Sequence, residues 1–253
     1  MLKLPRIMGA ALLAWPLLAV GSSPASALRL VPFIAEFAPS GTGATQLFRV
    51  ENDGDQPVAV QISMVHRKME SDGRETMPEA DDDFAVFPPQ LVLTAREVRT
   101  VRVQYLGDPK PEREAAYRII AEQLPVDLDA TPSGARLRLL VRYEGAIYVV
   151  PPDVSPRAVV KSLESVRRPD GSPGLAITVE NSGTAHALLS DLRLVVKSAD
   201  GASMQLDQPE QLEGMLGENV LAGVSRRFVI GWPQGLKPSA LSASMTFGVQ
   251  KKQ

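Results

Sequence analysis

The stretch from residue 135 to residue 152, ARLRLLVRYEGAIYVVPP, carries the alternation on which our fold prediction rests. Leu137, Leu139, Val141 and Tyr143 occupy every second position, and charged side chains lie between some of them. A β-strand points successive side chains to opposite faces, so this pattern predicts a strand with one apolar row. The row either fills a core or lies on an exposed strand edge, and alternation alone leaves both interpretations open.

Strand-like alternation continues on both sides of this stretch. Short apolar segments end at turn-forming clusters such as Asn52-Asp53-Gly54, Ser71-Asp72-Gly73 and Asp200-Gly201. Many short strands at even spacing are typical of antiparallel sandwiches of immunoglobulin type. We therefore predict an all-β fold.

Three local features qualify this pattern. The segment at 114–126, EAAYRIIAEQLPV, fits a helix or a strand, and its neighbours and Pro125 favour a strand. Pro88 and Pro89 indicate a strand edge or an irregular crossing. Gly145 is a candidate for a β-bulge at which the opening strand changes phase.

Prolines also mark a domain boundary. Pro151, Pro152 and Pro156 interrupt the strand pattern and are typical of a stiff linker. We predict one domain at 28–152 and a second at 153–253. FRVENDGDQPVAVQI and ITVENSGTAHALLSDLRL share a strand, Val-Glu-Asn, a glycine turn and a second strand. This weak repeat suggests two domains of similar build, and coincidence stays an alternative for so short a match.

Residues 1–27 have the features of a secretory signal peptide. A basic start precedes an apolar run at 8–20, and Ala25-Ser26-Ala27 forms a small-x-small cleavage site. A membrane anchor is the alternative, but the run is short and contains Pro16. We expect cleavage after Ala27, export from the cytosol and no membrane insertion of the mature chain.

Composition excludes several functions. The 253 residues include no cysteine and only two histidines, and the formal net charge is −2. Cysteine catalysis and a disulfide framework are excluded, and neither a histidine-rich metal site nor nucleic-acid binding through a basic surface is expected. Asp81–Asp83 fit a solvated acidic loop better than a calcium site. His66 and His186 are expected to be ordinary surface or hydrogen-bonded histidines. Because no catalytic or phosphate-binding motif is present, we expect no enzyme and no cofactor.

Four segments resemble, in order, the PapD-like periplasmic chaperones of chaperone–usher pilus assembly. They are FRVENDGDQPVAVQISM, FAVFPPQLVLTAREVRTVRVQYLG, PEREAAYRIIAEQLPV and LRLLVRYEGAIYVVPP, and they cover most of residues 28–152. The proline pair, the strand VRTVRV and Arg113-Glu114 form a fairly specific set, with Arg113 and Glu114 expected to hold the fold together. YRIIAEQLP is similar to the archaic or alternative branch. The second half of the chain matches only in length, strand content and position.

The resemblance implies two immunoglobulin-like sandwich domains with an inter-domain cleft. Such a chaperone is not an enzyme: it lends its own G strand to a pilus subunit that lacks a final strand, and the subunit then passes to an outer-membrane usher. The expected partners are therefore pilus or fimbrial subunits and the usher, with self-association through the G-strand edge left open. By place in the family, the donated side chains are Leu137, Leu139, Val141 and Tyr143.

The resemblance also implies a basic anchor for the subunit's terminal carboxylate. Well-studied members use an arginine on the first strand and a lysine late in the G strand. The lysine position is Ala146 here, and Arg29 stands too early in the first strand. We predict that Arg118 supplies the anchor, with Arg142 in reserve, because a guanidinium grips a carboxylate bidentately. An ordinary exposed strand arginine is the alternative for Arg118.

Two other functions remain to be weighed. One alternative is a secreted structural or adhesive β-sandwich protein, for example a pilus component. A subunit would carry a free N-terminal donor extension, whereas LRLVPFIAEF follows the predicted cleavage site almost at once. A hydrolase would need a clustered nucleophile and base, and the sequence offers none that can be recognised.

Overall fold

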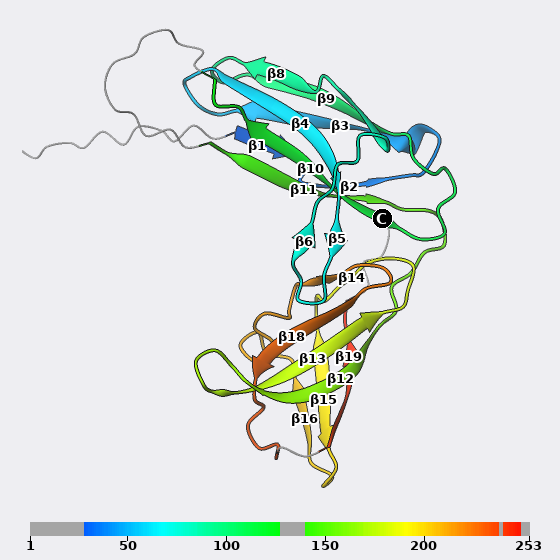
Figure 1. Ribbon diagram of the computed structural model, residues 1–253, viewed down its shortest axis with the longest axis vertical. Coiled ribbons are helices and arrows are strands. Elements are labelled where there is room, and N and C mark those ends of the chain that lie inside the picture. Colours follow the sequence, from blue (N-terminus) through cyan, green and yellow to red (C-terminus); the bar gives the residue numbers. More distant parts are fainter. Residues whose placement is uncertain (1–27, 127–139, 238–239, 249–253) are drawn as a thin grey trace, which may run out of the picture.

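The computed structural model describes residues 28–126, 140–237 and 240–248. In these ranges the strands gather in two groups, each around its own hydrophobic core, with one short 3-10 helix (Figure 1). The predicted all-β class of two immunoglobulin-like sandwich domains is confirmed. The predicted signal peptide lies outside the described residues.

The N-terminal domain consists of two packed sheets and a small hairpin. One sheet has the strand order β1-β3-β9-β7, and the other has the order β2-β11-β10-β4-β8. The hairpin β5–β6 forms a separate two-stranded sheet that extends toward the C-terminal domain (Figure 1). The elements are β1 (Leu28–Val31), β2 (Ile34–Phe37), η1 (Thr42–Ala44), β3 (Thr45–Asn52), β4 (Val58–His66), β5 (Lys68–Met69), β6 (Glu75–Thr76), β7 (Phe84–Phe87), β8 (Gln90–Leu93), β9 (Val98–Tyr105), β10 (Ala115–Gln123) and β11 (Arg142–Val149).

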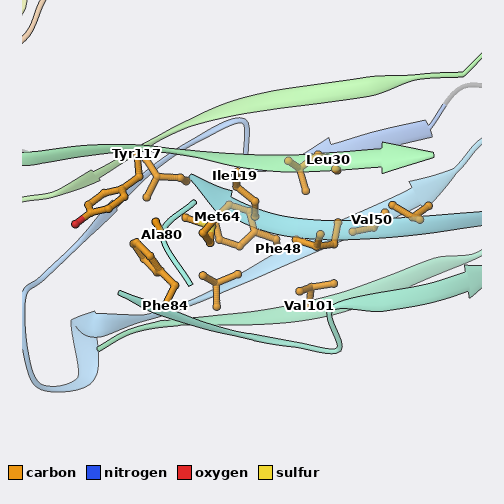
Figure 2. Packing of buried hydrophobic residues seen from close by; sticks show 14 of the residues in the cluster. Leu30, Phe48, Val50, Met64, Ala80, Phe84, Val101, Tyr117 and Ile119 are labelled. Carbon is orange, nitrogen blue, oxygen red and sulfur yellow. The ribbon is translucent and has the colours of Figure 1, made fainter. Parts of the chain in front are cut away.

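Alternating side chains of the facing sheets fill the N-terminal core, as Figure 2 shows. Phe48 and Val50 of β3 are fully buried, whereas Leu47 and Arg49, which precede them, point to solvent. Each buried side chain of this size stabilises the fold by about 1.5–3 kcal/mol. The same alternation places Met64, Val101 and Ile119 in this core, together with Leu30, Ala80, Phe84 and Tyr117.

The segment that fits a helix or a strand is a strand, and the proline pair lies between two strands. EAAYRIIAEQLPV forms β10, which pairs with β11 on one side and β4 on the other. Tyr117 and Ile119 are suited to this buried, two-sided position. The proline pair at 88 and 89 separates β7 from β8, which lie in different sheets. The predicted irregular crossing is therefore confirmed, because a proline cannot donate to a sheet ladder.

The C-terminal domain is a second sandwich with its own core. Its sheets have the orders β12-β13-β18 and β16-β15-β19, with a small pair β14-β17. Asp200-Gly201 forms the predicted turn between β15 and β16, with Gly201 at φ 88°. The strands are β12 (Ala158–Arg167), β13 (Pro173–Asn181), β14 (Ala187–Leu188), β15 (Arg193–Ser198), β16 (Ser203–Leu206), β17 (Asn219–Val220), β18 (Ser225–Gly231) and β19 (Leu241–Thr246).

The weak repeat has a structural counterpart in two buried asparagines. Asn52 ends β3, and its Nδ2 donates hydrogen bonds to the carbonyls of Gln56 and Thr94, both at 2.8 Å. Its Oδ1 accepts the amide of Gly54 at 3.0 Å. The side chain thus satisfies backbone groups of the following turn and of the β8–β9 connection.

Asn181 does the same at the end of β13. Its Nδ2 donates to the carbonyls of Ala185 and Val220 at 2.8 and 3.0 Å. Its Oδ1 accepts the amides of Gly183 and Arg157, both at 3.0 Å. Both copies of Val-Glu-Asn therefore end a strand on an asparagine that fastens the next loop.

A cleft lies between the two domains. Residues 150–157 join β11 to β12, and the predicted boundary between residues 152 and 153, which we retain as a proposal, falls in this segment. A pocket of about 340 Å³ is lined by Glu36 and Val150 on one side and by His186 and Phe247 on the other. Among the described residues, no helix is long and apolar enough to cross a membrane.

Candidate functional site

Strand β11 is the described part of the predicted donor strand. Val141 and Tyr143 are partly buried and pack against the N-terminal core, in phase with the fully buried Ile147 and Val149. The two other residues of the row, Leu137 and Leu139, lie outside the described residues. The C-terminal end of the apolar row therefore lies on the strand face that fills the core.

The predicted bulge at Gly145 is wrong. The register between β11 and β10 runs without a break from Arg142 to Val149. A Cβ at Gly145 would lie 2.7 Å from Cγ2 of Ile119 and 3.0 Å from the carbonyl oxygen of Phe33. The glycine thus makes room for its neighbours, and the strand does not change phase.

The first half of β11 has an open edge. Strand β2 pairs in parallel with β11 only from Ala146 onward, and the Ala146 amide donates to the carbonyl of Phe33 at 2.9 Å. Peptide groups along a strand alternate in direction, so the amides of Arg142 and Glu144 point to this same side. No described strand pairs with these two residues there.

Apolar side chains flank the open edge. Phe33 is 50% exposed and Ile34 is 64% exposed, although both are large hydrophobic residues. The Phe33 ring meets the Tyr143 ring edge to face, with centroids 6.5 Å apart. An unpaired edge beside exposed apolar side chains is a surface suited to strand addition.

Arg118 faces the inter-domain side of the same sheet and binds a carboxylate of its own chain. Its Nε and Nη2 lie 2.8–3.0 Å from the carboxylate oxygens of Glu75. Its Nη1 donates to the carbonyl of Glu144 at 3.3 Å, on the strand with the open edge. Arg118 therefore connects a carboxylate site with the edge of β11.

Arg67 holds the same carboxylate from the other side. Its Nη2 and Nε lie 2.7 and 2.8 Å from Oε1 of Glu75. The three side chains are largely buried, with exposed fractions of 7% for Arg67, 17% for Arg118 and 15% for Glu75. Burial opposes ionisation of Glu75, but the hydrogen bonds and charges of both arginines outweigh it and lower the pKa of this carboxyl.

Arg142, the reserve anchor, lies on the surface. It is 46% exposed and forms ion pairs with Glu144 at 3.0 Å and Glu122 at 3.4 Å. Such exposed pairs contribute little, because both charges keep most of their hydration. Arg142 and Arg118 project from neighbouring strands, but only Arg118 is enclosed with a second arginine.

The His186 ring is hydrogen-bonded and the His66 ring is partly exposed, as expected. Nδ1 of His186 lies 2.7 Å from Oε1 of the buried Glu114, and its ring stacks on Tyr148. His66 lies 3.6 Å from Asp83. Glu114 therefore links the domains, as its amide also donates to the carbonyl of Thr184 at 2.9 Å. In the ranges that the structure covers, no group of three metal-ligating side chains occurs.

Sequence reasoning missed Arg67 and Glu75. Arg67 follows β4, and Glu75 returns to it only because the β5–β6 hairpin folds back. The Arg67 guanidinium also donates to the Tyr148 hydroxyl at 2.9 Å, and Asn219 of the C-terminal domain donates to the same hydroxyl at 2.8 Å. A hairpin signal was present at Ser71-Asp72-Gly73, but the sequence gives no indication of the partner across the sheet.

The described residues form two immunoglobulin-like sandwich domains, and the first half of β11 has an open edge. Residues 40–155 match the family model described as "Pili and flagellar-assembly chaperone, PapD N-terminal domain". This match shows that the N-terminal part of the chain is similar to the PapD-like assembly chaperones. The resemblance found in the sequence is confirmed.

Solved structures with the same fold include a fimbriae chaperone and a chaperone–subunit complex. A chain of the CsuC–CsuE chaperone–tip adhesion subunit pre-assembly complex, from archaic chaperone–usher Csu pili of Acinetobacter baumannii, has a TM-score of 0.57. It is 15% identical, and the match covers 83% of our chain and 90% of that chain. The class 5 fimbriae chaperone CfaA has a TM-score of 0.53 at 15% identity, over 89% and 100% of the two chains. A search of curated proteins found no match.

Proposed function

We propose that the chain is a periplasmic chaperone that folds and caps pilus subunits by donor-strand complementation and delivers them to an outer-membrane usher. The observation that carries the proposal is the open edge of β11 at Arg142 and Glu144, beside the exposed Phe33 and Ile34. A subunit without its last strand has a complementary edge and an unfilled apolar groove.

The capping step needs only this strand. The backbone groups of Arg142 and Glu144 pair with a strand of the subunit, while the apolar row fills the groove. Burial of each donated side chain contributes about 1.5–3 kcal/mol. No cofactor takes part, since folding energy drives the step. The row consists of Leu137, Leu139, Val141 and Tyr143.

Arg118 and Arg67 together form the proposed carboxylate anchor. Two guanidinium groups surround one Glu75, so the cluster carries one uncompensated positive charge. This excess favours a second carboxylate, such as the C-terminus of a subunit strand lying along β11. Arg142 is less suited, because it is exposed and already lies between two glutamates.

The comparisons support the partner class. Two structures with this fold are described as complexes of a chaperone with a tip adhesin or tip adhesion subunit. The match to the family model favours the chaperone over a secreted structural sandwich. We propose that the predicted signal peptide directs export of the chain to the periplasm, where subunits fold. The same open edge also favours self-association of the free protein, because an unpaired strand edge pairs readily with another copy.

The test is a pull-down of subunits with tagged mature protein. The bait is added to periplasmic extract from cells that express the pilus components, beside Leu139→Arg and Leu140→Arg variants whose folding is verified. Leu140 is the neighbour of Leu139 in the sequence, and successive side chains of a donated strand would point to opposite faces, so Leu140→Arg is the matched control. We expect the parent and Leu140→Arg to recover a small secreted β-rich subunit and Leu139→Arg to lose it. Recovery of the subunit by Leu139→Arg would contradict donation of this strand and would mean that the subunit binds another surface.

A further inference from the structure

The carboxylate of Glu75 occupies the space between Arg67 and Arg118 that an incoming carboxylate would need. Nε and Nη2 of Arg67 contact Oε1 of Glu75, and Nη2 of Arg118 contacts both oxygens. Nε of Arg118 contacts Oε2, and all these distances are 3.0 Å or less. Glu75 belongs to β6, and the loop that precedes it reaches the C-terminal domain. The arginine pair of the free protein is therefore already filled from within the chain.

We infer that Glu75 is an internal stand-in for the carboxylate of a bound subunit, and that the β5–β6 hairpin withdraws it when that carboxylate binds. This inference rests on the proposed function, since it names the regulation of the same site. Glu75 neutralises one of the two arginine charges until the carboxylate of a subunit replaces it.

Charge and burial make the exchange selective. Removal of Glu75 without replacement would leave Arg67 and Arg118 as buried cations without a counter-ion, which is strongly unfavourable. A bound segment that supplies a carboxylate avoids this cost, whereas a segment without a carboxylate leaves both arginines unpaired. Glu75 therefore discriminates in favour of a segment with a free C-terminus.

The hairpin is built so that it can move. Strands β5 and β6 contain two residues each and form their own two-stranded sheet, a unit of marginal stability by itself. Its tip is held by few groups: the carbonyl of Ser71 accepts the amide of Arg227, and Gly73 packs against the Arg226 guanidinium. Withdrawal of Glu75 thus breaks contacts to one short segment and leaves the cores of both domains intact.

The decisive experiment is chemical rescue of Glu75→Ala by acetate. This substitution removes a CH2–COO⁻ fragment, which has the size of acetate. Thermal unfolding is followed at pH 7 in increasing sodium acetate, with sodium chloride at equal ionic strength as the reference. We expect the Tm of Glu75→Ala to rise saturably by about 3 °C or more, because a ligand that binds only the folded state stabilises it.

The matched control is Glu180→Ala, which removes a glutamate from an exposed pair with Lys161 in the C-terminal domain. Neither this variant nor the parent should respond to acetate beyond the chloride reference. If Glu75→Ala fails to fold, Glu75→Gln is titrated with acetate while the Arg118 Nε–H signal is followed by NMR. Absence of an acetate-specific response in the Glu75 variant, or an equal response in the parent, would overturn the inference.

A second readout separates this inference from the proposed function. Glu75→Gln should capture the subunit recovered in the pull-down several-fold faster than the parent, because no resident carboxylate has to leave. Equal or slower capture, with Leu139→Arg still inactive, would refute the gate and leave strand donation standing. Acetate rescue with no subunit recovered by any bait would instead refute the proposed function.

Discussion

The Tyr148 ring of the N-terminal domain lies flat against the His186 ring of the C-terminal domain, with centroids 4.1 Å apart and planes 13° apart. Burial raises the pKa of the Tyr148 phenol, so its hydroxyl stays neutral and accepts hydrogen bonds from Arg67 and Asn219. Because Tyr148 belongs to β11, the strand with the open edge is fixed to both domains.

We first predict that Tyr148→Phe destabilises the protein by about 1–3 kcal/mol. The variant keeps the stacked ring but leaves the Arg67 and Asn219 donors without this acceptor. Urea unfolding measures the loss. Tyr143→Phe is the control, because the described structure gives the Tyr143 hydroxyl no hydrogen bond; an equal loss in both variants would contradict the role of the Tyr148 hydroxyl.

The two buried asparagines give a paired prediction. Asn52→Ala and Asn181→Ala should each lower the free energy of unfolding by about 2–4 kcal/mol, because each leaves several buried backbone groups without a partner. Calorimetry should assign the loss to the N-terminal domain for Asn52 and to the C-terminal domain for Asn181. Asn→Asp at either site keeps the acceptor but loses the Nδ2 donors, and near-native stability of that variant would sink the explanation.

Acid should weaken the Glu75 cluster. The two arginines hold the pKa of Glu75 below its ordinary value of about 4.3, so the folded state keeps this carboxylate charged to lower pH than the unfolded chain does. The carboxylate contributes its full stabilisation above the pKa that Glu75 has in the unfolded chain. This stabilisation is lost as the pH falls through the lower pKa of the folded state. We expect the free energy of unfolding of the parent to exceed that of Glu75→Gln by about 2–4 kcal/mol at pH 7.

The comparison is made by urea unfolding of parent and Glu75→Gln between pH 7 and pH 3. The difference should stay constant down to about pH 5 and shrink below about pH 4. A difference that persists unchanged at pH 3 would show that charge is not what Glu75 contributes.

Local signals made most of the fold predictable. Turn residues after Asn52 and at Asp200-Gly201, together with strict alternation in segments such as β3, specify strands without knowledge of their partners. Proline chemistry likewise marked the crossing between β7 and β8. These features depend on neighbours in the chain, which the sequence displays directly.

The candidate site depends on distant partners, and there prediction from sequence failed or stopped. Glu75 meets Arg118 across 43 positions, and Arg67 meets Tyr148 across 81. Arg118 was identified only through the family resemblance, which gave no reason to expect an internal carboxylate. The prediction for Gly145 failed because this position is a glycine for a steric reason: a Cβ there would clash with the side chain of Ile119 on the neighbouring strand β10.

The most direct test of strand addition is amide hydrogen exchange along β11, in the free chaperone and in its complex with the captured subunit. In the free protein, the amides of Tyr143 and Gly145 should be protected by β10, whereas those of Arg142 and Glu144 should exchange fast. In the complex, Arg142 and Glu144 should become protected while Tyr143 and Gly145 stay as they were. Unchanged fast exchange at Arg142 and Glu144 with the subunit bound would contradict the account.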